Sequence, residues 1–236
     1  MVSPQRIQKV IRFSDYLDHK VGVVGLLARK PGGKKADVER LITEGDACMD
    51  RRIPEDAIPF YARALEISPE NSDVWNRLGL ANFLVKEYEK AIGCYENALE
   101  INPDNIEAWI NKGKVMVTLK RYPEAFACYD TVIRKNPPNL AAVWSEKGIA
   151  YYRATAYEEA VDCFDRALQT DPRRQESLLW KGLALCRMGN YQDAVRYYDQ
   201  VLQINPINTR ARAYQKIALE MLDRYGGTSQ KQIKDF

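Results

Sequence analysis

The chain has 236 residues, and its 35 Lys and Arg nearly balance its 32 Asp and Glu, which leaves a formal net charge of +3. This length suits one elongated repeat array or one to two globular domains. The charge is uneven, because residues 1–36 carry +6, residues 37–208 carry −6 and residues 209–236 carry +3. An acidic array between basic ends indicates solubility and steering of a protein partner, and argues against nucleic acid.

Cysteine and histidine usage argues against several classes of protein. The five cysteines are odd in number and widely spaced, which argues against a disulfide framework and for a reducing, cytoplasmic compartment. His19 is the only histidine, so the sequence lacks the close Cys and His spacing of a metal site. It also lacks a paired-carboxylate motif or nucleophile elbow for acid–base or covalent catalysis. We therefore predict a non-enzymatic protein without a metal or cofactor.

The first segment in chain order is a basic N-terminal extension, residues 1–36. Apolar residues at helical spacing after Pro4 predict an amphipathic helix. The apolar run at 21–28 has only eight residues and is too short to span a bilayer. No small-residue cleavage site follows, which argues against a signal peptide. Residues 29–35 (RKPGGKK) indicate a linker to the rest of the chain.

Residues 72–105 carry the pattern around which the chain is organised. Apolar residues recur there at three- and four-residue steps in both halves, as two short amphipathic helices require. A turn follows at Asn102–Pro103–Asp104–Asn105, because Pro lacks an N–H and disfavours α geometry in the residue before it. Neither helix can bury its apolar face alone, so we expect the unit to be repeated.

The unit recurs at a nearly constant period. Glycine, alanine and proline each recur at steps of 34, 34, 35 and 34 residues. The three columns are Gly45, Gly79, Gly113, Gly148 and Gly182; Ala57, Ala91, Ala125, Ala160 and Ala194; and Pro69, Pro103, Pro137, Pro172 and Pro206. Self-similarity at this period is the signature of a helical repeat array. It predicts five tandem repeats within residues 37–208, namely 38–71, 72–105, 106–139, 141–174 and 175–208, with Leu140 inserted in a longer turn.

Residues 209–225 predict one further amphipathic helix. Lys216 stands where the repeat would place glycine, so this helix does not begin a sixth repeat. A helix at this place would cover the apolar end that an array otherwise leaves in water. We expect residues 226–236, which begin with Gly226 and Gly227, to form a mobile tail.

Aromatic residues form three further columns, one of which is Tyr88, Tyr122, Tyr157 and Tyr191. The other two are Tyr61, Tyr95, Tyr129, Phe164 and Tyr198, and Trp75, Trp109 and Trp144. With the other columns they resemble the tetratricopeptide repeat family, whose pattern is Trp, Leu-Gly, Tyr, Ala, Phe and Pro at these spacings. The resemblance covers residues 38–208. It implies an all-α fold: a right-handed superhelical array of antiparallel helix hairpins with a C-terminal capping helix, in which the column residues pack between helices.

The resemblance also implies where a ligand binds. In this family a concave groove is lined by first-helix positions that are not used for packing between helices. Carried over repeat by repeat, the candidate peptide- or protein-binding residues are Asn76, Leu80, Phe83, Ile110, Lys114, Val117, Ser145, Ile149, Tyr152, Arg153, Leu179, Leu183 and Arg187. Many are apolar, and a contiguous exposed apolar patch usually marks an interface. We therefore predict a protein–protein interaction scaffold that binds a protein or peptide.

Two alternatives remain beside this prediction. The +6 charge of residues 1–36 beside the −6 array suggests that this segment covers the groove of its own chain or of a neighbour. The protein would then be a self-associating assembly module, or homo-oligomer. RNA binding is the other alternative, but it needs basic or base-stacking residues along the groove, and the array is acidic.

Overall fold

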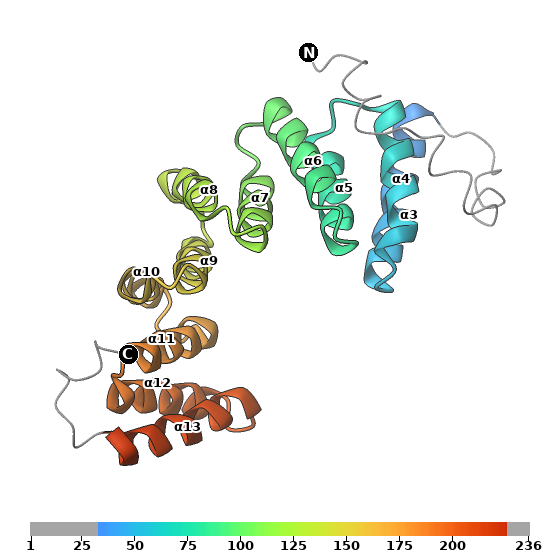
Figure 1. The fold of residues 1–236 in the computed structure, drawn as a ribbon. Helices are drawn as coiled ribbons and strands as arrows, with labels where there is room; N and C mark the ends of the chain where they lie inside the picture. The colour runs from blue at the N-terminus through green and yellow to red at the C-terminus, as the bar shows by residue number, and fades with distance from the viewer. Residues whose placement is uncertain (1–32, 226–236) are drawn as a thin grey trace. The chain divides into compact units, whose positions relative to one another are not determined.

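The computed structural model describes residues 33–225, in which short turns connect α-helices (Figure 1). The helices are α3 (Lys34–Asp50), α4 (Pro54–Ile67), α5 (Ser72–Leu84), α6 (Tyr88–Ile101), α7 (Ile106–Thr118), α8 (Tyr122–Arg134), α9 (Leu140–Arg153), α10 (Tyr157–Thr170), α11 (Gln175–Arg187), α12 (Tyr191–Ile204) and α13 (Thr209–Tyr225). No strand occurs among these residues, which confirms the predicted all-α class. The predictions for residues 1–32 and for the tail at 226–236 lie outside the described residues.

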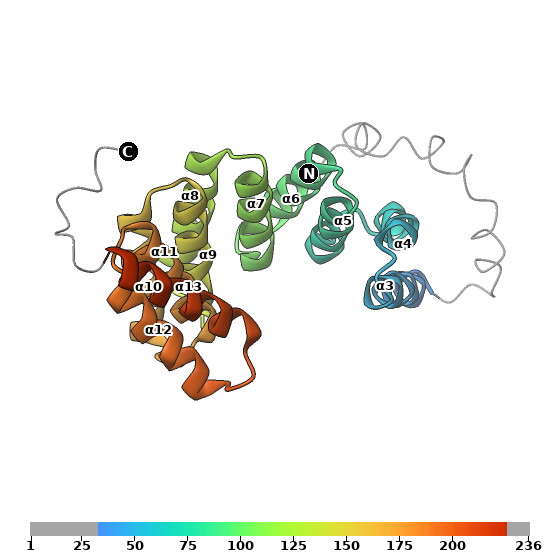
Figure 2. The ribbon, with the colours of Figure 1, turned by 60° about the horizontal axis from the view of Figure 1, so that its bottom comes forward.

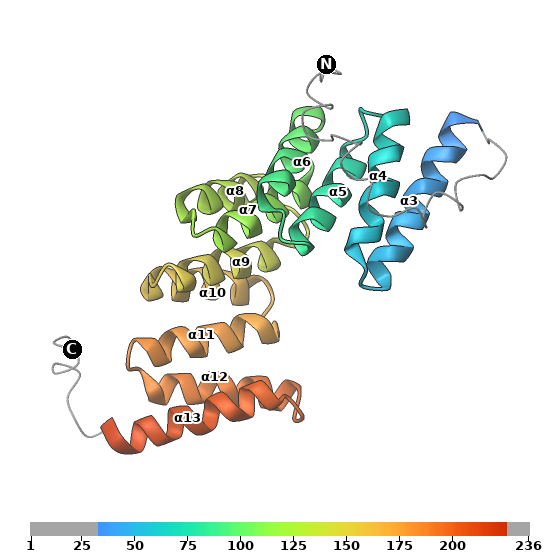
Figure 3. The same ribbon diagram turned by 45° about the vertical axis from the view of Figure 1, so that its right-hand side comes forward.

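The described residues divide into two compact blocks between Val115 and Met116, inside α7. We call residues 33–115 the N-terminal block and residues 116–225 the C-terminal block. In the N-terminal block α3 packs on α4, α4 on α5 and α5 on α6 (Figure 2). In the C-terminal block each helix from α8 to α13 packs on the next, and α11, α12 and α13 lie side by side (Figure 3).

A glycine and an aromatic ring bring the two helices of a hairpin together. A Cβ atom built on Gly148 of α9 would lie 2.6 Å from the ring of Phe164 in α10. Gly79 stands in the same relation to Tyr95, with the same distance of 2.6 Å. Both rings are fully buried, so the absence of a Cβ on the first helix makes room for a large apolar surface on the second.

The turn inside each hairpin requires one residue in the left-handed region. The residues with positive φ at this equivalent place are Arg52, Lys86, Lys120, Thr155 and Gly189. The backbone N–H of Thr155 donates to the carbonyl of Tyr152, and that of Ala156 to the carbonyl of Tyr151. These bonds satisfy carbonyls that the end of α9 would otherwise leave without a partner. Only Gly189 adopts the conformation without the steric cost that a Cβ brings.

From α6 onward, a side chain of each first helix donates a hydrogen bond to a side chain of the second helix before it. The Lys112 ammonium donates to Glu96 at 2.9 Å in the N-terminal block. In the C-terminal block Lys147 donates to Asp130 at 2.5 Å, and Lys181 donates to Asp165. The same place after the last repeat has Gln215, whose amide donates to Asp199 at 2.5 Å.

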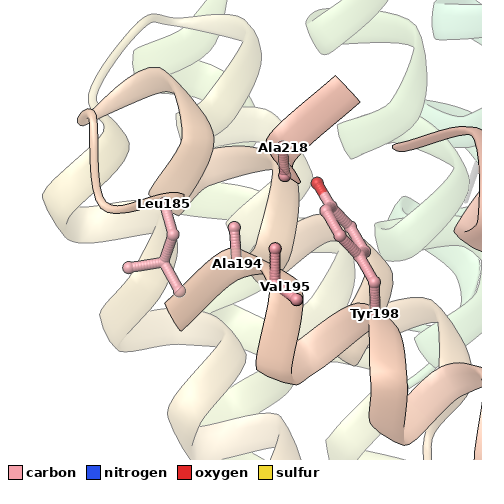
Figure 4. Close-up of a cluster of buried hydrophobic side chains, with 5 residues drawn as sticks. All are labelled: Leu185, Ala194, Val195, Tyr198 and Ala218. Carbon is pink, nitrogen blue, oxygen red and sulfur yellow. The ribbon is translucent and has the colours of Figure 1, made fainter. Parts of the chain in front are cut away.

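In the C-terminal block α13 packs on the side of α12 that would otherwise face solvent. Ala218 is fully buried beside Leu185, Ala194, Val195 and Tyr198 (Figure 4). This packing agrees with the geometry of a capping helix. Whether the array depends on it for stability stays a prediction, which deletion tests.

The turn before α9 is longer than its counterparts. It covers residues 135–139, whereas the other turns between hairpins cover 68–71, 102–105, 171–174 and 205–208. Leu140, the inserted residue, is the first residue of α9.

Candidate functional site

The first helices of the hairpins present two faces, one in each block. Positions three or four residues apart share one side of a helix. The N-terminal face comprises Ile42, Asp46, Met49 and Asp50 of α3; Asp73, Asn76, Leu80, Phe83 and Leu84 of α5; and Glu107, Ile110 and Lys114 of α7. The C-terminal face comprises Ile149, Tyr152 and Arg153 of α9; Leu179, Leu183, Cys186 and Arg187 of α11; and Ala213, Ile217 and Glu220 of α13.

The N-terminal face contains a charged network at Asp46. Arg77 Nη1 lies 2.7 Å from both carboxylate oxygens of Asp46, and the Tyr61 hydroxyl donates to Oδ1 at 2.6 Å. Burial, followed by the hydrogen bond to Asp46, raises the pKa of Tyr61 well above its usual range. Asp46 therefore joins α3 to α4 and α5, and its acceptor capacity is already largely used within the protein.

Asn76 is placed in the interior between α5 and α7. Its amide nitrogen donates to Glu107 Oε2 at 3.3 Å, and its amide oxygen accepts from Asn111 Nδ2 at 3.0 Å. The residue is only 6% exposed. Both the amide nitrogen and the amide oxygen of Asn76 are thus used in hydrogen bonds to the neighbouring first helix, α7.

The apolar residues of the N-terminal face are partly accessible. Leu80, Phe83 and Ile110 are half-buried, and so is Lys114. Leu84 is 51% exposed. The ring of Phe83 packs on Tyr88 of α6 with centroids 5.9 Å apart.

Ser145 is a fully buried polar residue in the C-terminal block. Its hydroxyl donates to the carbonyl of Ala141, lies 2.5 Å from the hydroxyl of Ser177, and accepts from Arg174 Nε at 3.0 Å. Because the single Ser145 hydrogen is used on Ala141, Ser177 is the donor of the pair. Arg174 is the residue just before α11. At the equivalent position before α5, α7 and α13, the side chains of Asn71, Asn105 and Asn208 accept a backbone N–H from the helix that follows.

Tyr152 is the centre of the C-terminal face. Its ring meets Tyr157 and Trp180 edge-on, with centroid distances of 5.4 and 5.2 Å. Arg187 Nε donates to the Tyr152 hydroxyl at 3.2 Å, and this hydrogen bond raises the pKa of Arg187. Tyr152 therefore joins α9 to α11 and holds one edge of an exposed guanidinium.

The rest of the C-terminal face is apolar with a basic edge. Ile149, Leu179 and Leu183 are half-buried, and Arg153 and Arg187 are exposed. Within residues 33–225 neither arginine makes an ion pair. The backbone carbonyl of Arg153 accepts from the Tyr122 hydroxyl at 2.9 Å, which fixes the end of α9.

The structure thus divides the predicted binding residues into two groups. Asn76, Val117 and Ser145 are buried, so their side chains are removed from an accessible surface. The other ten are half-buried or exposed: Leu80, Phe83, Ile110, Lys114, Ile149, Tyr152, Arg153, Leu179, Leu183 and Arg187. Ligand binding by any of them stays a prediction.

Sequence reasoning missed the part of the face on α13. Ile217 is 48% exposed and follows Leu183 by 34 residues. Ala211 and Ala218 of α13 are fully buried and follow Ser177 and Ala184, which are also buried, by the same spacing. Helix α13 therefore has the rotational phase of α11, which places Ile217 on the same side as Leu183. The repeat spacing was the signal that could have revealed this.

Residues 33–225 contain no group of three or more His, Cys, Asp or Glu that could hold a metal ion. Burial raises the pKa of the Cys94 thiol to about 12 and that of Cys163 to about 11, which leaves both thiols protonated near neutral pH. Within the same residues no helix has the length and apolar character needed to cross a membrane.

Comparison with protein families gives one consistent result. Three profiles of the tetratricopeptide repeat match residues 72–105, 94–127 and 145–219. A search of curated proteins found no match.

Solved structures with the same fold cover most of the chain. PilF of Pseudomonas aeruginosa is 22% identical, with 86% of this chain and 98% of that chain covered and a TM-score of 0.67. MamA from Desulfovibrio magneticus RS-1, from residue 41 onward, is 19% identical, with 75% and 98% covered and a TM-score of 0.64. YrrB, a TPR protein with an unusual peptide-binding site, is 19% identical, with 88% and 99% covered and a TM-score of 0.59. At these identities the likeness shows the fold alone.

Proposed function

Because this chain belongs to the tetratricopeptide repeat family, we propose that it is a non-enzymatic protein-interaction scaffold that binds a peptide or protein segment on its first-helix faces. One observation supports this most directly. On the C-terminal face, half-buried aliphatic and aromatic side chains of α9 and α11 lie beside exposed arginines that make no ion pair within residues 33–225. An apolar centre with a polar rim is the usual anatomy of a protein interface.

The relatives support the proposal only at the level of fold. YrrB carries a peptide-binding site on a scaffold of this kind, but its residues are 19% identical to those of this chain. A cytoplasmic location is part of the proposal, because all five cysteines are free thiols and four are buried.

Selection of peptides from a random display library on the intact chain tests the function. The enriched peptides are then measured against Ile149→Ser and Leu183→Ser, with Ile133→Ser as control, because Ile133 is also half-buried but lies on the second helix α8. We expect the two face variants to lose about tenfold or more in affinity and the control to lose little. Equal affinity in all variants, after thermal melts confirm folding, would place binding elsewhere.

A second candidate function is self-association through residues 1–36. Residues 37–115 have 9 basic and 16 acidic residues, whereas residues 1–36 have eight basic and two acidic. Such complementarity steers association. Removing residues 1–32 should then lower the number of subunits per particle at low salt. An unchanged oligomeric state at both low and high salt would contradict this candidate.

A further inference from the structure

We propose, resting on the function proposed above, that the C-terminal face selects a protein segment in which carboxylates adjoin an apolar stretch. The carboxylates bind Arg153 and Arg187 at the ends of α9 and α11. The apolar stretch lies along Ile149, Leu183 and Ile217, so that α13 is part of the binding surface as well as the end of the array.

The two arginines are distinguished by their place on the C-terminal face. Some basic residues of the block have an acidic partner, whereas others, such as Arg166 and Arg173, have none within residues 33–225. Lys147, Lys181 and Arg196 pair with Asp130, Asp165 and Asp193. Arg153 and Arg187 are exposed, occur one repeat apart and make no ion pair within residues 33–225. Two guanidinium groups at the same level of neighbouring helices form a site for anionic side chains.

Tyr152 prepares Arg187 for such a ligand. Its hydroxyl accepts from Arg187 Nε, so the two Nη groups remain as donors for a carboxylate. The Tyr152 ring is itself held between Tyr157 and Trp180. Part of the side-chain entropy that an exposed arginine loses on binding is therefore already lost in the free protein.

The apolar part of the surface continues past the last repeat. The shared rotational phase of α11 and α13 aligns Ile217 with Leu183, and Ile149 precedes Leu183 by 34 residues on α9. Ala213 is exposed next to Ile217, one helical turn earlier. A ligand that runs across the three helices thus meets an aliphatic side chain on each.

The charges of the C-terminal block indicate how the ligand is oriented across α9, α11 and α13. The C-terminal block has 16 basic and 13 acidic residues, which favours an anionic partner over a cationic one. Glu220 is the acidic residue at the corresponding level of α13, where it follows Cys186 of α11 by 34 residues. We therefore assign the carboxylates to the part of the ligand that lies over α9 and α11, next to Arg153 and Arg187. The part that lies over α13, near Glu220 and Ile217, carries apolar residues without carboxylates.

Synthetic peptides with one leucine-rich core and Asp, Asn or Lys at one end test the proposal on the intact chain. We expect the Asp peptide to bind most tightly, with a preference over the Lys peptide that shrinks as salt is added. The variant Arg153→Glu/Arg187→Glu should lose roughly tenfold in affinity for the Asp peptide at low salt and keep its affinity for the Asn peptide. Tyr152→Phe should lose less, because the ring remains.

Matched variants separate this result from a general effect of charge or exposure. Arg173→Glu makes the same kind of charge reversal, at one site instead of two, in the turn before α11, at the opposite end of that helix, and should leave the affinity unchanged. Ile217→Ser should weaken all peptides several-fold, while Leu219→Ser should not, although the two residues are 48% and 44% exposed on the same helix. Thermal melts exclude unfolding.

Equal binding of the Asp, Asn and Lys peptides would overturn the inference and leave the proposed scaffold function standing. So would equal losses in Arg173→Glu and the double variant. Binding of none of the peptides also contradicts the inference, whereas the display-library selection decides the scaffold function separately. Equal effects of Ile217→Ser and Leu219→Ser would remove α13 from the surface.

Discussion

The two blocks share one scaffold but present different faces. In the N-terminal block polar side chains of the face bind one another: Arg77 pairs with Asp46, and Asn76 donates to Glu107. Much of the hydrogen-bonding capacity of this face is therefore already used within the protein. In the C-terminal block the two arginines of the face, Arg153 and Arg187, have no carboxylate partner within the described residues. The buried columns therefore specify the fold, while the positions between them are free to set what each block binds.

The largest effect should come from deleting residues 209–236, because this exposes the side of α12 that α13 covers. Uncovering several hundred Å² of apolar surface at about 25 cal/mol per Å² costs on the order of 5–10 kcal/mol. The loss should fall on the C-terminal block alone. Hydrogen exchange resolved by helix measures this, and unchanged protection in α11 and α12 would show that α13 is not a structural cap.

Adding a methyl group to the hairpin glycines should cost about 3 kcal/mol in either block. Gly79→Ala and Gly148→Ala each bring a Cβ to 2.6 Å from a buried ring. Gly33→Ala is the matched control, since a Cβ there meets nothing within 4 Å. Chemical denaturation gives the free energies, and a cost below about 1 kcal/mol at both sites would mean that the rings can move aside.

Removing a hydroxyl should have opposite effects at two neighbouring repeats of the N-terminal block. Tyr61→Phe removes the hydrogen bond to Asp46 and should cost about 1–2 kcal/mol. The Tyr95 hydroxyl is buried without a partner among the described residues, so Tyr95→Phe should be neutral or stabilising by about 1 kcal/mol. Equal losses in the two variants would indicate that a water molecule satisfies Tyr95.

The smallest effect should appear in the hairpin turns of the C-terminal block. Thr155, a β-branched residue with φ 62°, should gain about 1 kcal/mol on replacement by glycine. Gly189, with φ 82°, should lose a similar amount on replacement by alanine. Thermal melts of the two variants should therefore shift in opposite directions, and shifts of the same sign would contradict this account of the turns.

Much of the fold could be predicted because the repeated columns reveal both helix pairing and phase. The burial of Asn76 and Ser145 could not be predicted in this way. Asn76 and Ser145 look like surface residues in their own repeats, and only the partners supplied by the next helix, such as Asn111 and Ser177, bury them. The place of Ile217 on the same side as Leu183 was missed for a different reason: α13 lacks the glycine and so does not look like a repeat.

The measurement that tests the central claim most directly is site-specific photo-crosslinking with the Asp-ended peptide. A photoreactive residue is placed in turn at Ile217 and at Leu219 of the intact chain, two exposed positions on one helix. If the C-terminal face extends onto α13, crosslinks form from position 217, are competed by unlabelled peptide, and are weak from position 219. Equal crosslinking from both positions, or crosslinking from 219 alone, would contradict the assignment of the ligand to the first-helix face.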